Sequence, residues 1–111
     1  MTQEFLESDW KLFRSKIAAW QEAYMEKLNR EYINLLSGDG NASDKFWQLN
    51  KRLSVDKRSS GVQVKLSRSS MIFNIIAMIN DGVIDLCELD DFSDEMKETV
   101  KAFVRNSASD T

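Results

Sequence analysis

One short acidic run has a spacing that could bind a metal ion. The run Asp81–Leu89 matches the second half of a calcium-binding EF-hand loop, with the required glycine at Gly82 and a glutamate, Glu88, at the last ligand position. The first and third ligand positions of such a loop would fall on Ala77 and Ile79. Neither side chain carries an oxygen, and calcium needs several oxygen ligands. The same residues suit a helix end followed by a new helix start, so we predict no metal here.

The chain lacks the residues that most enzymes use for acid–base or nucleophilic chemistry. It contains no histidine, no Gly-x-Ser-x-Gly motif and no glycine-rich phosphate loop. The lone cysteine, Cys87, stands in an acidic stretch that disfavours its thiolate, so we interpret it as a small buried hydrophobic residue. The sequence therefore predicts a protein that is not an enzyme and that holds no cofactor.

Charge is distributed unevenly along the chain, and this pattern suggests a binding surface. Residues 45–68 hold seven basic residues against one acidic residue, a net charge of +6, whereas residues 69–111 hold nine acidic against three basic residues, a net charge of −6. One interpretation is that both segments are solvated faces that attract each other. The other is an interaction patch for phosphate or for an acidic partner. The patch would consist of Lys45, Lys51, Arg52, Lys57, Arg58, Lys65 and Arg68.

A long amphipathic helix is predicted before this basic segment. Apolar and aromatic residues recur every three or four positions from Trp10 to Leu36, which is the spacing of one helix face. Ser8 can cap this helix, and Asp9 in its first turn suits the positive end of the helix dipole. Gly38 ends the helix.

Two further helices follow, and the start of the second of them stays open. One begins near Ser43 and fades over residues 57–60. The next is predicted from about Gly61 to Asn80, where Asp81-Gly82 stops it. The alternation in residues 62–66 also fits an extended segment, so the sequence does not decide between helix and strand for residues 61–66.

A short turn capped by Asp85 and Glu88 connects to the last helix, which Ser93 caps. Residues 1–105 are predicted as a single helical domain, and residues 106–111 as a frayed tail. The expected fold is all-α, a compact bundle of about four helices with a long first helix and a short capped turn before the last. Its core is expected to contain Phe13, Ile17, Trp20, Phe46, Leu49, Phe73, Ile76, Leu89 and Val100.

Several short motifs occur together between Trp10 and Val104. They are Leu36-Ser37-Gly38-Asp39-Gly40, Ala42-Ser43-Asp44-Lys45-Phe46-Trp47, Asp56-Lys57-Arg58, Gly61-Val62, Ser67-Arg68-Ser69-Ser70-Met71, Asp81-Gly82-Val83-Ile84 and Phe92-Ser93-Asp94-Glu95. With this set, the chain resembles a family of small uncharacterised helical proteins of Gram-positive bacteria, some of which carry a multidrug-transporter label. Relatives often have proline where this chain has Ser60, which leaves the start of the third helix in question. The resemblance implies no catalytic residues, and the label does not fit, because no apolar run is long enough to span a bilayer.

The sequence thus predicts a small cytoplasmic, non-enzymatic interaction or regulatory protein that acts through a protein partner. The alternative is a nucleic-acid-binding accessory protein that uses the basic segment 45–68, which the overall net charge of −3 disfavours. A single cysteine, no bilayer-spanning run and no basic segment at the start favour the cytoplasm and no membrane association. Self-association stays open, because the apolar stripe of the first helix can exceed what one small core covers.

Overall fold

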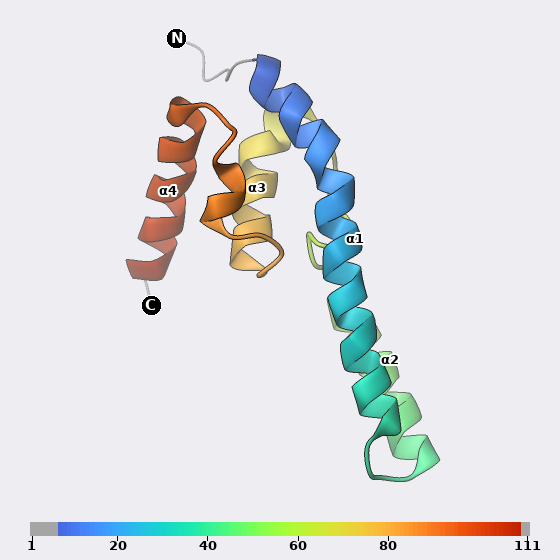
Figure 1. Ribbon diagram of the computed structural model, residues 1–111. Helices are drawn as coiled ribbons and strands as arrows, with labels where there is room; N and C mark the ends of the chain where they lie inside the picture. Colours follow the sequence, from blue (N-terminus) through green and yellow to red (C-terminus); the bar gives the residue numbers. More distant parts are fainter. Residues whose placement is uncertain (1–6, 110–111) are drawn as a thin grey trace.

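The protein is all-helical over residues 7–109, and no strand occurs within this range. The computed structural model describes the backbone of residues 7–109 and the side chains of residues 7–104. The elements are α1 (Glu7–Ser37), α2 (Ala42–Asp56), the 3₁₀-helix η1 (Arg68–Ser70), α3 (Met71–Asn80), the 3₁₀-helix η2 (Leu86–Leu89) and α4 (Asp94–Ser109) (Figure 1). The prediction of an all-α fold with four helices and a long first helix is confirmed.

Helix α1 lies along the long axis of the molecule. One group of helices packs on its N-terminal half, and α2 packs on its C-terminal half. Figure 1 shows α3 and η2 beside the N-terminal half of α1, with α4 on their far side, whereas α2 runs back along the C-terminal half of α1 and forms a hairpin with it. The principal extents are 58 × 32 × 21 Å, and the radius of gyration is 16.8 Å. A compact domain of this length has a radius of gyration of about 13 Å. The hairpin therefore extends beyond the three-helix part.

The hydrophobic core lies between the N-terminal half of α1, the segment α3–η2 and α4. Its predicted members Phe13, Ile17, Trp20, Leu89 and Val100 are buried. Tilted aromatic contacts connect Phe13 to Trp20, and Trp20 to Phe92, with ring centroids 6.2 and 6.5 Å apart. The remaining buried core residues are Met71, Ile75, Met78, Ile84, Phe92 and Met96.

Two residues predicted for the core lie on the surface instead. Phe46 is 62% exposed and Phe73 is 67% exposed, while Leu49 and Ile76 are half-buried. On α3, the face built from Met71, Ile75 and Met78 turns inward, so Phe73 is on the opposite side. On α2, no residue is buried, because this helix contacts only α1 at its half-buried positions. The expectation that all four helices share one core was wrong for α2.

A buried acid connects the first turn of α1 to the start of α4. Asp9 is only 2% exposed, and its carboxylate accepts hydrogen bonds from the backbone N–H and the hydroxyl of Ser93 at 2.9 and 2.6 Å. Ser93 in turn caps α4 through a hydrogen bond from the Met96 N–H, as predicted. The prediction for Asp9 itself was incomplete. Its main contacts are with another helix, and Ser8, predicted as a cap, lies inside α1.

The third helix begins ten residues later than predicted, at Met71 instead of Gly61. Residues 63–67 are extended or irregular, and Ser67 caps η1 by accepting a hydrogen bond from the Ser70 N–H. A tight contact explains the irregular start, because Gly61 is buried directly against the ring of Tyr24. A Cβ atom at Gly61 would lie 2.1 Å from that ring.

In the link between α3 and α4, the acidic run of residues 81–89 forms a helix end followed by the start of a new helical turn, as predicted. Gly82 has a positive φ of 79° just after α3, and Ile84 then returns to the core. The short helical turn forms as η2, but without the predicted capping box, since no side-chain cap bond is made by Asp85. The interpretation of Cys87 as buried was wrong. The turn directs Leu89 inward and leaves Cys87 exposed.

Two helix ends differ slightly from their predicted positions. Asn41, two residues before the predicted Ser43, caps α2 by accepting a hydrogen bond from the Asp44 N–H at 2.8 Å. Helix α4 continues through Ser109, and residues 110–111 of the predicted frayed tail lie outside the described residues. Helix α1 ends at Ser37, directly before Gly38, as predicted.

Candidate interaction surface on the helical hairpin

The hairpin of α1 and α2 exposes several large apolar side chains. Phe46 and Trp47 are 62% and 63% exposed, and their rings pack edge to face with centroids 5.1 Å apart. Ile33 is 61% exposed, and Leu36 and Leu53 are also exposed. Single exposed apolar residues are common, but six within one hairpin, with Val55 included, are typical of a binding surface.

Three of these side chains lie on the same side of the hairpin. The half-buried positions Leu35 on α1 and Leu49 on α2 mark where the helices face each other. Because α-helices are right-handed and these two are antiparallel, the residues next to this contact on one side are Leu36 from α1, and Phe46 and Leu53 from α2. Ile33 is two residues from Leu35 and therefore lies on the side of α1 that faces away from α2. We call these three residues, together with Trp47, whose ring packs against that of Phe46, the hairpin face.

A polar network holds the two helices of the hairpin together. Arg52 on α2 forms ion pairs with Glu31 at 2.8 Å and with Asp56 at 3.3 Å, and its guanidinium lies 5.5 Å from the centre of the Tyr32 ring. The Tyr32 hydroxyl donates to Asp56 at 2.6 Å. Burial, and next the hydrogen bond to Asp56, raises the pKa of Tyr32 to about 12. The hairpin face therefore sits on a fixed scaffold.

The seven basic residues predicted as a patch are spread along the molecule. Lys45 lies near Gly40 at the tip of the hairpin, whereas Arg68 pairs with Glu7 at 2.5 Å at the other end of α1. Helix α1 has 31 residues and is therefore about 45 Å long.

The ion pairs of this segment go to α1 and α2, and none within the described side chains joins it to residues 69–111. Arg52 and Arg68 are used in these pairs. The exposed basic residues of the segment are Lys51, Lys57, Arg58, Lys65 and Arg68.

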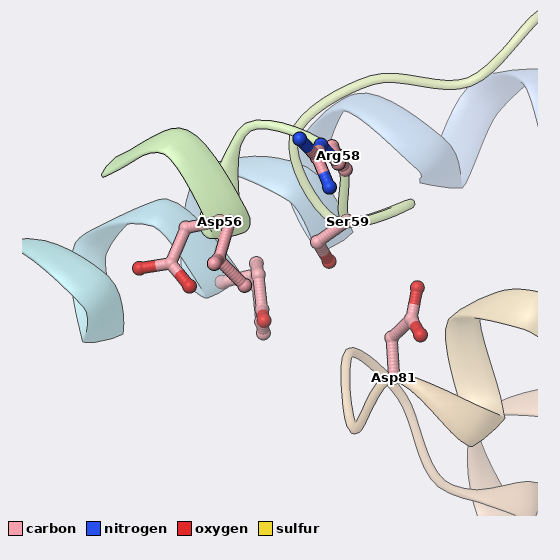
Figure 2. A pocket seen from close by; sticks show the side chains of 6 residues that line it. Asp56, Arg58, Ser59 and Asp81 are labelled. Atoms are coloured by element: carbon pink, nitrogen blue, oxygen red, sulfur yellow. The ribbon is translucent and has the colours of Figure 1, made fainter. Parts of the chain in front are cut away.

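An open polar pocket of about 350 Å³ lies at the base of the hairpin, where it meets α3 (Figure 2). In Figure 2, Asp56 and Asp81 extend from opposite sides, with Ser59 and Arg58 between them. Both carboxylates are occupied, because Asp56 binds Tyr32 and Arg52, and Asp81 accepts two hydrogen bonds from Ser60 at 3.0 and 2.7 Å. The hydrogen bonds from Ser60 to Asp81 therefore join the link after α2 to the C-terminal end of α3.

Neither a metal-binding cluster nor a membrane-spanning helix occurs in the described part of the chain. Over that part, no cluster of three or more acidic, cysteine or histidine side chains is placed to hold a metal ion. No helix there combines the length and apolar character needed to cross a membrane. Asp81, first in the EF-hand-like run, is bound to Ser60.

Sequence reasoning placed Phe46 in the core and so missed this surface. A signal was present in α2, whose apolar residues Phe46, Trp47, Leu49, Leu53 and Val55 cover more of the helix circumference than a single contact with α1 needs. The protein is thus an all-helical scaffold, and its candidate site is the exposed apolar surface of the projecting hairpin. No protein-family model, curated protein or solved structure that was compared with the chain matches it. The resemblance to the Gram-positive family stays a prediction.

Proposed function

We propose that the protein is a small non-enzymatic interaction protein that binds another protein through the hairpin face. One observation carries the proposal: Phe46 and Trp47 lie side by side, each more than 60% exposed, on a helix none of whose residues is buried. Aromatic side chains contribute a large share of the binding energy at protein interfaces. Leaving them in water has a cost that a partner removes.

The fixed geometry of the hairpin supports this function. Arg52 and Tyr32 hold the two helices together, and Asn41 caps α2 next to the exposed aromatics. A surface that is already ordered loses less conformational entropy when it binds. A cytosolic location belongs to the same proposal, supported by the exposed thiol of Cys87, which suits a reducing compartment. Any regulatory role would depend on the identity of the protein that binds the hairpin face.

The test compares proteins retained from a lysate of the host, after nuclease treatment, by the tagged wild type and by the variants Phe46→Ser and Trp47→Ala. We expect both variants to lose the retained partner while keeping their fold, because exposed side chains change the free energy of unfolding by less than about 0.5 kcal/mol. Val55→Ser is the matched control for Phe46→Ser, since Val55 is equally exposed, at 61%, and lies nine residues from Phe46, on the opposite side of α2. Retention that is unchanged in both face variants would contradict the proposal.

Binding of nucleic acid is the second candidate, favoured by the exposed side chains of Lys51, Lys57 and Arg58 near the base of the hairpin. Substituting these three by alanine tests it without disturbing Arg52, which holds the hairpin together. Phosphate contacts make the affinity fall steeply with salt. Binding of labelled DNA or RNA that shows this salt dependence, and that the triple variant loses, would favour this candidate over the first.

A further inference from the structure

The chain contains two Asp-Gly pairs, and the structure places them in different surroundings. Asp39-Gly40 lies in the loop between α1 and α2, at the end of the hairpin farthest from α3 and α4 (Figure 1). Asp81-Gly82 directly follows α3. We propose that Asp39 is a site of spontaneous covalent modification, at which aspartate isomerises to isoaspartate, and that Asp81 is protected from the same reaction.

The reaction needs only an aspartate, the backbone amide of the next residue, and water. The Gly40 nitrogen attacks Cγ of Asp39, an N–Cγ bond forms, and the carboxyl hydroxyl and the amide hydrogen leave as water. Water then opens the resulting succinimide ring. Opening at Cγ restores aspartate, whereas opening at the main-chain carbonyl carbon gives isoaspartate, whose backbone runs through Cβ and Cγ. The water released equals the water consumed, and no oxidant or reductant takes part.

Both glycines leave the approach to the amide open. Glycine after aspartate favours ring closure, because it has no side chain to obstruct the attacking nitrogen. A Cβ atom at Gly40 would meet only the Lys45 side chain, at 3.9 Å, and one at Gly82 would meet nothing within 4 Å. Steric cover therefore does not distinguish the two pairs, and the difference comes from their hydrogen bonds.

Hydrogen bonds hold both reactive groups of Asp81-Gly82. The Asp81 carboxylate accepts hydrogen bonds from the backbone N–H and the hydroxyl of Ser60, at 3.0 and 2.7 Å. The Gly82 N–H donates to the carbonyl oxygen of Ile79 at 3.1 Å. Ring closure requires the carboxyl carbon to move onto the Gly82 nitrogen, which breaks all three bonds. Asp81 is therefore held away from the reactive geometry.

Neither reactive group of Asp39-Gly40 is held in this way. The Asp39 carboxylate and the Gly40 N–H make no hydrogen bond to any other described residue, and both residues are exposed in a loop of bends. The neighbouring Asn41 side chain is directed to α2, where it accepts a hydrogen bond from the Asp44 N–H. Three hydrogen bonds must break at Asp81 and none at Asp39, which corresponds to a difference in rate of roughly 100-fold.

Isoaspartate at this position changes the connection between the two helices that carry the hairpin face. It adds one carbon to the backbone, just before the Asn41 cap of α2. Leu36 of the hairpin face lies before this point in the chain, and Phe46 lies after it. We therefore expect the isomerised protein to retain its partner less well than the unmodified protein. This consequence rests on the proposed function, whereas the modification of Asp39 does not.

The test incubates the full chain for several weeks at physiological temperature and then compares two tryptic peptides by liquid chromatography and mass spectrometry. Peptides 31–45 and 69–97 contain Asp39 and Asp81, respectively. An isoaspartate form has the same mass but a different retention time, and electron-transfer fragmentation locates it in the peptide. In the folded protein we expect isoaspartate at Asp39 and roughly 100-fold less at Asp81. In concentrated guanidinium chloride, where the hydrogen bonds of the folded state are absent, the two sites should react at similar rates.

Asp39→Glu is the control variant, because its additional methylene group enlarges the ring and slows closure, so its peptide 31–45 should show no isomer at this position. A folded wild type in which Asp81 reacts as fast as Asp39, or in which Asp39 stays unmodified, would overturn the proposal.

The outcomes also separate this inference from the proposed function. If isomerised protein retains its partner as well as the unmodified protein does, the expected consequence is wrong and the modification site stands. If unmodified protein retains no partner through the hairpin face, the proposed function fails together with this consequence. The peptide comparison decides the modification of Asp39 in either case.

Discussion

Asp9 is a buried acid whose hydrogen bonds join residues 84 positions apart in the sequence. A carboxylate of this kind is stable in the interior only when its oxygens have donors, and Ser93 provides two. The contact fixes where α4 begins relative to α1. It is a tertiary contact that no local motif around Asp9 announces.

Replacing Asp9 by alanine should lower the free energy of unfolding by about 1–3 kcal/mol, because the two part-buried donors of Ser93 lose their acceptor. Urea denaturation monitored by circular dichroism measures this loss. Asp91→Ala is the control, since Asp91 is 76% exposed and its only described ion pair is a 3.8 Å contact with Lys16. Equal losses in the two variants would show that the Asp9 contact is not important for stability.

Tyr32 gives the hairpin a dependence on alkaline pH. The folded state favours the neutral phenol and raises its pKa from 10.0 to about 12, so its stabilisation is present below pH 10 and is lost as the pH rises through about 12. The difference in tyrosinate absorbance between the wild type and Tyr32→Phe isolates this ionisation. We expect its midpoint near pH 12. A midpoint near pH 10 would mean that the contact with Asp56 is absent in solution.

Helix α3 shows how neighbouring apolar residues of one element differ in role. Ile75 is fully buried, whereas Phe73, two residues earlier, is 67% exposed beside Phe103. We expect Ile75→Ala to cost about 2–5 kcal/mol of unfolding free energy, and Phe73→Ala less than about 1 kcal/mol despite its larger side chain. Thermal or urea denaturation of the two variants measures both values. A larger loss for Phe73→Ala would reverse the assignment of the buried face.

The ends of the helices were predictable where their chemistry is local. Gly38, Gly82 and Ser93 act within one turn of their own position, and the structure uses each as the sequence indicates. The start of α3 was not predictable. Residues 61–66 fit two periodicities, and the contact that decides between them, Gly61 against Tyr24, comes from a distant helix. The inward face of α3 likewise depends on where α4 packs.

At the scale of the whole molecule, the sequence indicated the helices but not their distribution over α1. A periodic stripe shows that a helix has an apolar side, but not which partner covers each part of it. The N-terminal half of α1 packs on α3 and α4, whereas the C-terminal half packs on α2 and, through Tyr24, on Gly61 in the link after α2. The hairpin face became visible only from this division. An extended particle also elutes earlier than a sphere of equal mass, so sedimentation is the better measure of oligomeric state.

The same division determines the order in which the chain can fold as it is synthesised. The hairpin can close once residues up to Asp56 have left the ribosome, because the ion pair of Arg52 with Glu31 and the hydrogen bond of Tyr32 to Asp56 both lie within that stretch. Phe13 and Ile17 must wait for partners from Met71 to Val100. At roughly 5–20 residues per second, several seconds pass before these partners emerge. During this interval the nascent chain presents an uncovered apolar helix, which is the kind of segment that chaperones bind.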